Sequence, residues 1–262
     1  ITLIIYFFIP VFLIIGTGIS ELAIIVLSFK FIIDFLFFKK LKSYNKNLLF
    51  FLLFIYFGLL VNLIFSVNFE NSFLRNVFFI KYIIFIVGTI DFFSRRKLEF
   101  FLVLKIWLLI LLIFSFDLII QFITQKNMIG LQSPLKYHRL SGFMGDELKA
   151  GSLILSFCFI VSGYLINSDN NKMKGILLLC FFVVTIFITG DRSNFLKSLL
   201  IAFCLIFFID KKFIKKSIAS FSVMLGLIFL IIITNNVFKE RFKNKIFDDL
   251  TKNNFNILKF VK

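Results

Sequence analysis

The sequence predicts an all-α, polytopic membrane protein built as a bundle of transmembrane helices. Of its 262 residues, 60% are hydrophobic, 43 are Phe and only 2 are Pro, and the mean hydropathy is +1.00. A soluble fold of this size lacks the interior to bury so much apolar surface. The apolar runs are long and continuous, as in helices of about 20 residues that cross ~30 Å of hydrocarbon, and they lack the alternation of a transmembrane β-barrel.

Nine apolar runs separated by charged breaks are candidate spans, and together they predict a helical bundle over residues 1–234. They cover residues 1–16, 19–38, 48–66, 75–93, 100–120, 148–167, 175–190, 194–209 and 217–234. Gly16 and Gly18 leave two readings open for the first two runs, a turn between two helices or a kink within one longer helix.

Four of the breaks are rich in Lys and Arg, namely 39–47, 94–99, 168–174 and 210–216. Basic residues are enriched in the cytoplasmic loops of membrane proteins, so we expect these breaks inside. The outer face then receives 67–74, 121–147, 190–193 and everything after about residue 235.

The tail 235–262 places Phe238, Phe242, Ile246 and Leu250 at steps of four among Lys and Arg. This pattern is typical of a helix lying on a membrane surface, at the start of a large periplasmic loop; a basic tail with incidental aromatic residues fits it equally. Because the sequence opens on Ile and stops in a polar segment, we expect a fragment that lacks its C-terminal part.

Charge and cysteine content exclude several classes of protein. Much of the net charge of +16 lies in short loops, where it sets topology, so nucleic acid is not an expected partner. Cys158, Cys180 and Cys204 all lie in apolar runs, which argues against disulfides and for packing roles. No cluster has the ligand spacing of a structural zinc site and no phosphate-loop motif occurs, so no metal or other cofactor is predicted.

Charged residues within the runs are informative because they are costly in a bilayer. Lys30 and Asp34 are one helical turn apart and able to pair, while Asp91 and Lys105 can reach the cytoplasmic interface, so we assign these four structural roles. Most of the others are expected near the outer face: Glu21, Arg75, Lys81, Asp117, Arg139, Asp146, Glu147, Lys149, Asp191, Arg192 and Lys197.

The first outer segment of interest is "HRLSGFMGDELKAG". Arg139 is followed by Gly142 and Gly145, which permit tight backbone turns, and then by Asp146 and Glu147 at the start of the next run. Acidic residues suit a helix N-terminus, so the simplest interpretation of these two is a helix cap.

The second outer segment is "TGDRSNFLK". Gly190 ends a run, Asp191, Arg192 and Ser193 form a very short turn, and Lys197 lies in the first turn of the next run. Two basic anchors at the membrane interface are one interpretation. The other is that both segments together grip a pyrophosphate, because the planar guanidinium binds phosphate oxygens bidentately and keeps its charge.

His138 is the only histidine and therefore a candidate general base. The alternative is a solvated loop residue, and the positive charge of Arg139 beside it would depress its basicity.

The two segments, "RLSGFMGDELKAGSLI" followed by "FITGDRSNFLKSLLIAF", resemble the O-antigen ligase and O-antigen polymerase family of bacterial envelope glycosyltransferases. The family pattern is an Arg-x-Ser-Gly stretch with Gly-Asp/Asn-Glu entering a span, then a span that ends in Thr-Gly-acid/Ser-Arg-Ser. The two blocks cover about thirty residues of the chain, and their order and spacing among nine predicted spans carry the resemblance.

The resemblance implies a metal-independent, inverting glycosyltransferase of the bacterial inner membrane that works at the periplasmic face. It would move a glycan from an undecaprenyl-diphosphate carrier to an acceptor hydroxyl on lipid A-core or on a growing glycan. Arg192 and Arg139 would hold the diphosphate, with Glu147 as a catalytic support. The substrate-binding residues would be Lys197, Asp146, Asp191 and Ser193.

One element of the family pattern is missing. The family's catalytic His is expected in the large periplasmic loop after the ninth span, and this chain has no His after His138, so we expect the general base beyond Lys262.

Two other classes of protein fit the span count, a flippase or transporter of lipid-linked sugars and a structural subunit of an envelope complex. A flippase should line a transmembrane path with charge, whereas the ionisable residues here gather toward the outer face, which favours the transferase.

Overall fold

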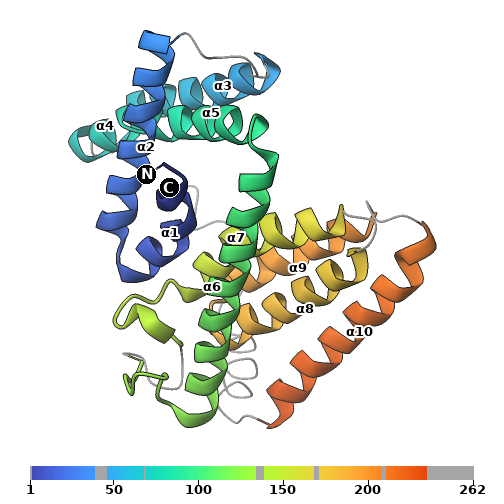
Figure 1. The fold of residues 1–262 in the computed structure, drawn as a ribbon. Coiled ribbons are helices and arrows are strands. Elements are labelled where there is room, and N and C mark those ends of the chain that lie inside the picture. Colours follow the sequence, from blue (N-terminus) through green and yellow to red (C-terminus); the bar gives the residue numbers. More distant parts are fainter. Residues whose placement is uncertain are drawn as a thin grey trace, which may run out of the picture. The chain divides into compact units, whose positions relative to one another are not determined.

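The computed structural model describes residues 2–38, 46–67, 69–133, 139–167, 171–207 and 211–234, most of which are helical (Figure 1). These residues contain no strand and only one isolated β-bridge, between Lys126 and Gln132. The predicted all-α class is therefore confirmed. The tail 235–262 and His138 lie outside the described residues.

Four helical stretches among the described residues are long and apolar enough to cross a membrane. They are Lys46–Ile64, Ser72–Ser94, Lys97–Thr124 and Phe213–Thr234, and two shorter apolar helices cover Thr2–Ile15 and Ala150–Ile166. This supports a membrane-embedded helical protein. Nine spans and their orientation remain a prediction.

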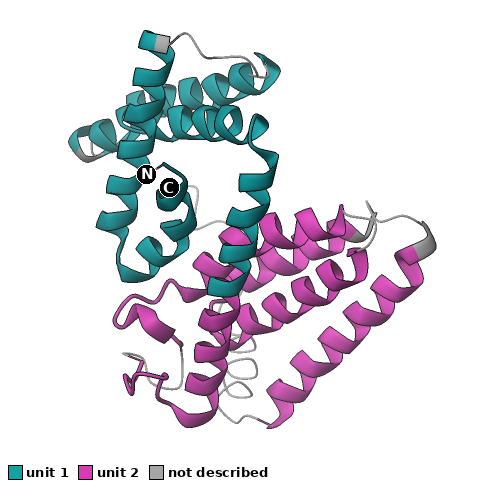
Figure 2. Ribbon diagram, in the orientation of Figure 1, with its two compact units in different colours: residues 1–110 teal, residues 111–262 magenta. Residues whose placement is uncertain are grey.

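The chain divides into two compact units, residues 1–110 and residues 111–262 (Figure 2). The first unit contains α1 (Thr2–Ile15), α2 (Thr17–Phe38), α3 (Lys46–Ile64), α4 (Phe69–Val77), α5 (Ile80–Ser94) and the first half of α6 (Lys97–Thr124). In this unit α2 packs against α1 and α5, and α3 packs against α4. A single residue, Gly16, separates α1 from α2, so the first two predicted runs are two helices.

Contacts within the first unit show that α2 and α5 run in the same direction. Glu21, at the start of α2, forms an ion pair with Lys81, at the start of α5. Further along, a Cβ added at Gly88 would lie 2.7 Å from the ring of Phe31, so the two helices are in close contact there. Two parallel helices agree with two predicted spans that both run from the outer to the inner face.

The second unit contains the end of α6, a short 3-10 helix η2 (Gly142–Met144), α7 (Ala150–Ile166), α8 (Lys172–Ile188), α9 (Arg192–Phe207) and α10 (Lys211–Thr234). Its helix α8 packs against α7, α9 and α10. The apolar core of this unit includes Ile176, Leu179, Val183, Phe187, Ala202, Met224 and Ile228.

Helices α7 and α8 form an antiparallel hairpin with close contacts at both ends. Cβ atoms added at Gly151 and Gly175 would lie 2.9 Å from Thr189 Oγ1 and 2.8 Å from Ile166 Cγ1, respectively. The start of α7 therefore adjoins the end of α8, and the end of α7 adjoins the start of α8.

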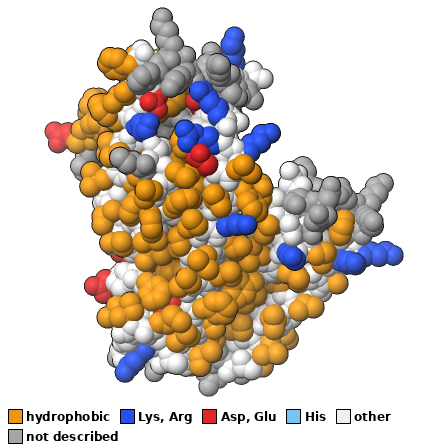
Figure 3. Space-filling model, in the orientation of Figure 1, with side chains coloured by type: hydrophobic (Ala, Val, Ile, Leu, Met, Phe, Trp, Pro, Cys, Tyr) orange, Lys and Arg blue, Asp and Glu red, His pale blue; other side chains and the backbone are white. Residues whose placement is uncertain are grey.

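Hydrophobic side chains dominate the face of the protein drawn in Figure 3. Many large apolar side chains are exposed, among them Phe50 (74%), Ile64 (78%) and Phe65 (78%). Contiguous apolar surface on this scale is unfavourable in water and is expected where helices contact lipid.

Candidate functional site

Asp191 organises the turn between α8 and α9. Gly190, with φ +74°, ends α8, and Asp191 follows it directly. Asp191 Oδ1 accepts hydrogen bonds from the backbone N–H of Asn194 (3.4 Å) and from Ser193 Oγ (3.2 Å), and its Oδ2 accepts one from Asn194 Nδ2 (2.7 Å). Asp191 therefore caps the N-terminus of α9, where a carboxylate is favoured.

Arg139 links the first outer segment to this turn. Its Nη2 donates to Asp191 Oδ2 at 3.3 Å and to the carbonyl of Leu148 at 3.0 Å. The backbone N–H of Leu140 also donates to the carbonyl of Thr189 at 3.1 Å. Two segments that lie 52 residues apart in sequence are thus in direct contact.

Polar side chains of α6 and of the loop itself hydrogen-bond to the backbone of the loop that carries Arg139. Gln121 Oε1 accepts a hydrogen bond from the backbone N–H of Gly142 (2.8 Å), and Asn127 Nδ2 donates to the Gly142 carbonyl (3.0 Å). Asp117 Oδ1 accepts from the backbone N–H of Met128 (2.8 Å). The loop conformation therefore depends on buried side chains that satisfy its backbone.

Gly142 is required where these groups meet. It has φ +57°, and an added Cβ would lie 3.0 Å from Asp117 Oδ2 and 3.2 Å from Leu118 Cδ2. Asp117 and Gln121 are fully buried, and Asp117 Oδ2 and Gln121 Nε2 make no hydrogen bond within the described part of the chain. The end of α6 therefore holds a buried acceptor, Asp117 Oδ2, and a buried donor, Gln121 Nε2, next to the loop and without a hydrogen-bond partner among the described residues.

Gln121 and Asn127 are not among the residues that the sequence predicted for the site. The usable signal was that Asp117 and Gln121 are four residues apart, on one face at the end of an otherwise apolar run. Asn127 gave no such signal because its role depends on a loop conformation that brings Gly142, fifteen residues away, within reach.

The three α9 residues that the sequence predicts near the outer face lie on different parts of the helix surface. Arg192 is the first residue of α9 and is partly exposed, whereas Ser193 and Lys197 are exposed and lie four residues apart on one face. Lys197 forms no ion pair with any described residue. Arg192 and Lys197 are separated by about 140° around the helix, so a ligand held by both would have to span the end of α9.

The helix-cap interpretation of Asp146 and Glu147 is wrong. Helix α7 begins only at Ala150, its N-cap position is Lys149, and no side chain caps it. Gly145, with φ +61°, turns the backbone away before the helix starts. Glu147 instead forms an ion pair with Lys149 (3.1 Å, side chains 38% and 55% exposed), while Asp146 is exposed and unpaired among the described residues.

In the first unit, the predicted pair of Lys30 and Asp34 is confirmed, with Nζ 3.0 Å from Oδ2. Asp91 pairs with Arg95, whose Nη2 lies 2.7 and 2.8 Å from its two oxygens. Lys105 Nζ lies over the ring of Phe101, 4.3 Å from its centroid.

The predicted packing role of the cysteines is confirmed for Cys158 and Cys180, which are free and buried. It is wrong for Cys204, which is exposed on α9 and can contact lipid in a membrane.

Within the described residues, no group of three or more His, Cys, Asp or Glu side chains is arranged to hold a metal ion. Comparisons of the chain with models of protein families, with curated proteins and with solved structures find no match. The resemblance of the two outer segments to a glycosyltransferase family therefore stands on those residues alone.

Proposed function

We propose that the protein is a glycosyltransferase of the bacterial inner membrane. It moves a glycan from an undecaprenyl-diphosphate carrier to an acceptor hydroxyl, on lipid A-core or on a growing polysaccharide, at the periplasmic face. The observation that carries this proposal is the contact between Arg139 and Asp191, which joins the two segments whose sequences resemble the O-antigen ligase and polymerase family.

The reaction needs stabilisation of a leaving group more than it needs covalent chemistry. The acceptor oxygen attacks the anomeric carbon, the bond from that carbon to the diphosphate oxygen breaks, and the acceptor proton passes to a general base. Negative charge develops on the undecaprenyl diphosphate as it leaves. Fixed cations beside that oxygen lower the barrier without any proton transfer to the leaving group.

Arg192 is the residue best placed to contact the diphosphate. It is the first residue of α9 and is partly exposed, directly after Asp191, whose carboxylate already caps the helix. A diphosphate beside the turn would therefore be held by the guanidinium itself, which binds phosphate oxygens bidentately. Lys197 and Ser193, on the neighbouring face of α9, would extend the contact toward the sugar.

Arg139 has a different role in this proposal. Arg139 Nη2 donates to Asp191 and to the Leu148 carbonyl, so the main role of Arg139 is to hold the loop. Its other guanidinium nitrogens would contact the substrate. Glu147 and Asp146 lie on the same loop, are accessible to water, and are assigned to orienting the substrate.

The test is glycan transfer by the complete protein in liposomes, with an undecaprenyl-diphosphate-linked oligosaccharide and an acceptor glycan and without added metal. We expect Arg192→Ala to reduce transfer by about a hundredfold or more, as for loss of one group that stabilises developing charge. Arg139→Ala should reduce both transfer and stability. Arg75→Ala is the matched control, because Arg75 is an exposed arginine on α4, outside the second unit, and should have no effect.

Full transfer by Arg192→Ala would remove the diphosphate role from this residue. If the complete protein instead moved the lipid-linked sugar between leaflets without consuming it, the transferase proposal would be replaced by a flippase.

A further inference from the structure

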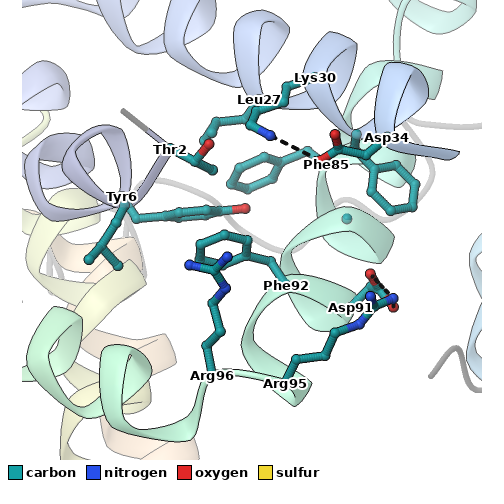
Figure 4. Close-up of a pocket in the computed structure, with 13 residues that line it drawn as sticks. Thr2, Tyr6, Leu27, Lys30, Asp34, Phe85, Asp91, Phe92, Arg95 and Arg96 are labelled. Carbon is teal, nitrogen blue, oxygen red and sulfur yellow. Dashed lines mark hydrogen bonds and ion pairs between the residues drawn. The ribbon is translucent and has the colours of Figure 1, made fainter. Parts of the chain in front are cut away.

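Charged side chains of α2, of α5 and of the short break after α5 converge on a pocket that the proposed transferase site does not use. The pocket has a volume of about 430 Å³ and lies between the start of α1 and the ends of α2 and α5 (Figure 4). Its polar lining consists mainly of Tyr6, Lys30, Asp34, Asp91, Arg95 and Arg96. Three cations and two carboxylates line it, and a third carboxylate, Glu99, pairs with Arg96 from outside the lining, so each cation of the pocket has one acidic partner.

Each cation of the pocket is held by an acid but keeps donors in reserve. Arg95 uses Nη2 for both oxygens of Asp91 (2.7 and 2.8 Å), and Arg96 uses Nη1 for both oxygens of Glu99 (3.0 and 3.1 Å). The remaining guanidinium nitrogens of both arginines make no hydrogen bond to any described residue. The acids therefore orient the guanidinium groups and leave part of each available to a ligand.

The pocket also has an apolar wall. The guanidinium of Arg96 lies over the ring of Phe92, 4.8 Å from its centroid, as Figure 4 shows. Leu27 and Phe31 of α2 and Phe85 of α5 add further apolar side chains to the lining. A ligand that fills this space needs an anionic group for the arginines and an apolar portion for the rings, which describes an amphiphile.

We propose that this pocket binds the phosphate head group of an anionic phospholipid. Phosphate oxygens accept several hydrogen bonds from guanidinium groups, which suits two arginines with unused donors. Basic pockets between transmembrane helices are typical lipid head-group sites, and the basic break at 94–99 predicts the cytoplasmic leaflet. The proposal rests on membrane insertion of the first unit and is independent of the transferase activity.

The experiment is native mass spectrometry of the complete purified protein in detergent, titrated with phosphatidylglycerol and, separately, with diacylglycerol, which lacks the phosphate. We expect one phosphatidylglycerol per chain and no retained diacylglycerol. Arg96→Gln should weaken phosphatidylglycerol binding roughly tenfold, the effect of losing one charge-assisted hydrogen bond. Arg75→Gln makes the same chemical change at an exposed position outside the pocket and should bind as the parent protein does.

A second variant separates head-group binding from loss of an ion pair. Glu99→Gln removes the negative charge that pairs with Arg96 but keeps an acceptor for its guanidinium, so phosphatidylglycerol binding should be unchanged or tighter. Equal weakening by Glu99→Gln and Arg96→Gln would overturn the proposal, as would equal binding by Arg96→Gln and Arg75→Gln. Displacement of the lipid by glycerol 3-phosphate at similar concentrations would assign the pocket to a soluble phosphate ester instead.

Discussion

At the scale of single residues, the loop that carries Arg139 and the turn between α8 and α9 both depend on Asp191. One carboxylate accepts hydrogen bonds from Ser193 and Asn194 on α9 and from Arg139 on the preceding loop. The cap of a helix and the attachment of a loop are therefore the same interaction, and neither can be removed without affecting the other.

Replacement of Asp191 by Ala should lower the free energy of unfolding by about 0.5–2 kcal/mol through loss of the helix cap, and further because Arg139 loses its acidic partner. Asp191→Asn should lose less, since Asn is also a good N-cap residue. Unfolding of the complete protein in mixed detergent micelles measures both. Asp146→Ala is the control, and a loss equal to that of Asp191→Ala would refute the capping role.

Asn127 offers a second test at this scale. Its side chain donates to the Gly142 carbonyl and accepts from the backbone N–H groups of Ile129 (3.1 Å) and Leu131 (2.7 Å). Asn127→Ala should release the loop and make it cleavable by limited proteolysis, with a loss of stability of about 1–3 kcal/mol for the buried groups left unpaired. Asn62→Ala, at an exposed position on α3, should leave the cleavage pattern unchanged.

At the scale of the element, α7 contains two glycines in opposite situations. A Cβ at Gly151 would lie 2.9 Å from Thr189 Oγ1 and 3.0 Å from Asp191 Cβ, whereas a Cβ at Gly163 would have nothing within 4 Å. Gly163→Ala should therefore be neutral or stabilise by up to about 1 kcal/mol, as expected for Ala in a helix.

Gly151→Ala should destabilise the protein and separate α7 from the turn that carries Asp191. Unfolding midpoints of the two variants, measured side by side, check both expectations. Equal behaviour of the two alanine variants would show that α7 does not pack against this turn as closely as described.

The sequence predicted the helices better than it predicted how the loops attach to them. Every predicted run contains a helix, and Gly190 ends a helix where expected, because apolar length and glycine are local signals. At Gly16 the sequence left a turn and a kink both open, and the structure has two helices there. The run at 75–93 is interrupted in the structure, with α4 ending at Val77 and α5 starting at Ile80. The start of α7 was misjudged because the positive φ of Gly145 delays the helix, and no pattern of neighbouring residues reveals a dihedral angle.

In the candidate site, too, single residues were predicted better than the contacts between them. Arg139, Asp191 and Arg192 were found because charge stands out against an apolar background. The pairing of Arg139 with Asp191 across 52 residues was beyond reach, since it depends on how α7 and α8 pack. Gln121 is neutral, and its one signal in the sequence, the spacing of four residues from Asp117, does not show which loop backbone it binds.

At the scale of the whole molecule, the predicted orientation can be tested with single cysteines. Cys204 is exposed and must first be replaced by Ser, whereas Cys158 and Cys180 are buried. Gln132 and Lys97 are exposed, on a predicted outer loop and a predicted inner break, respectively. We expect Gln132→Cys to react with an impermeant thiol reagent on intact cells and Lys97→Cys only after lysis. The reverse pattern would invert the topology and place the proposed site in the cytoplasm.

Helix α6 has 28 residues and is long for a membrane of ordinary thickness. At ~1.5 Å per residue it spans roughly 42 Å, against ~30 Å of hydrocarbon, and Lys97 and Asp117 are separated along it by roughly 30 Å. A bilayer whose hydrocarbon is as thick as the distance between Lys97 and Asp117 keeps one of these residues at each of its boundaries. Longer acyl chains would draw the buried carboxylate and the loop above it toward hydrocarbon, a hydrophobic mismatch that must be relieved by tilt or by local thinning.

The thickness of the surrounding bilayer therefore becomes a determinant of this protein's stability. We expect the midpoint temperature of unfolding in liposomes to be highest near ordinary thickness and to fall as acyl chains lengthen. A midpoint that rises steadily with chain length would show that Asp117 does not mark the edge of the membrane.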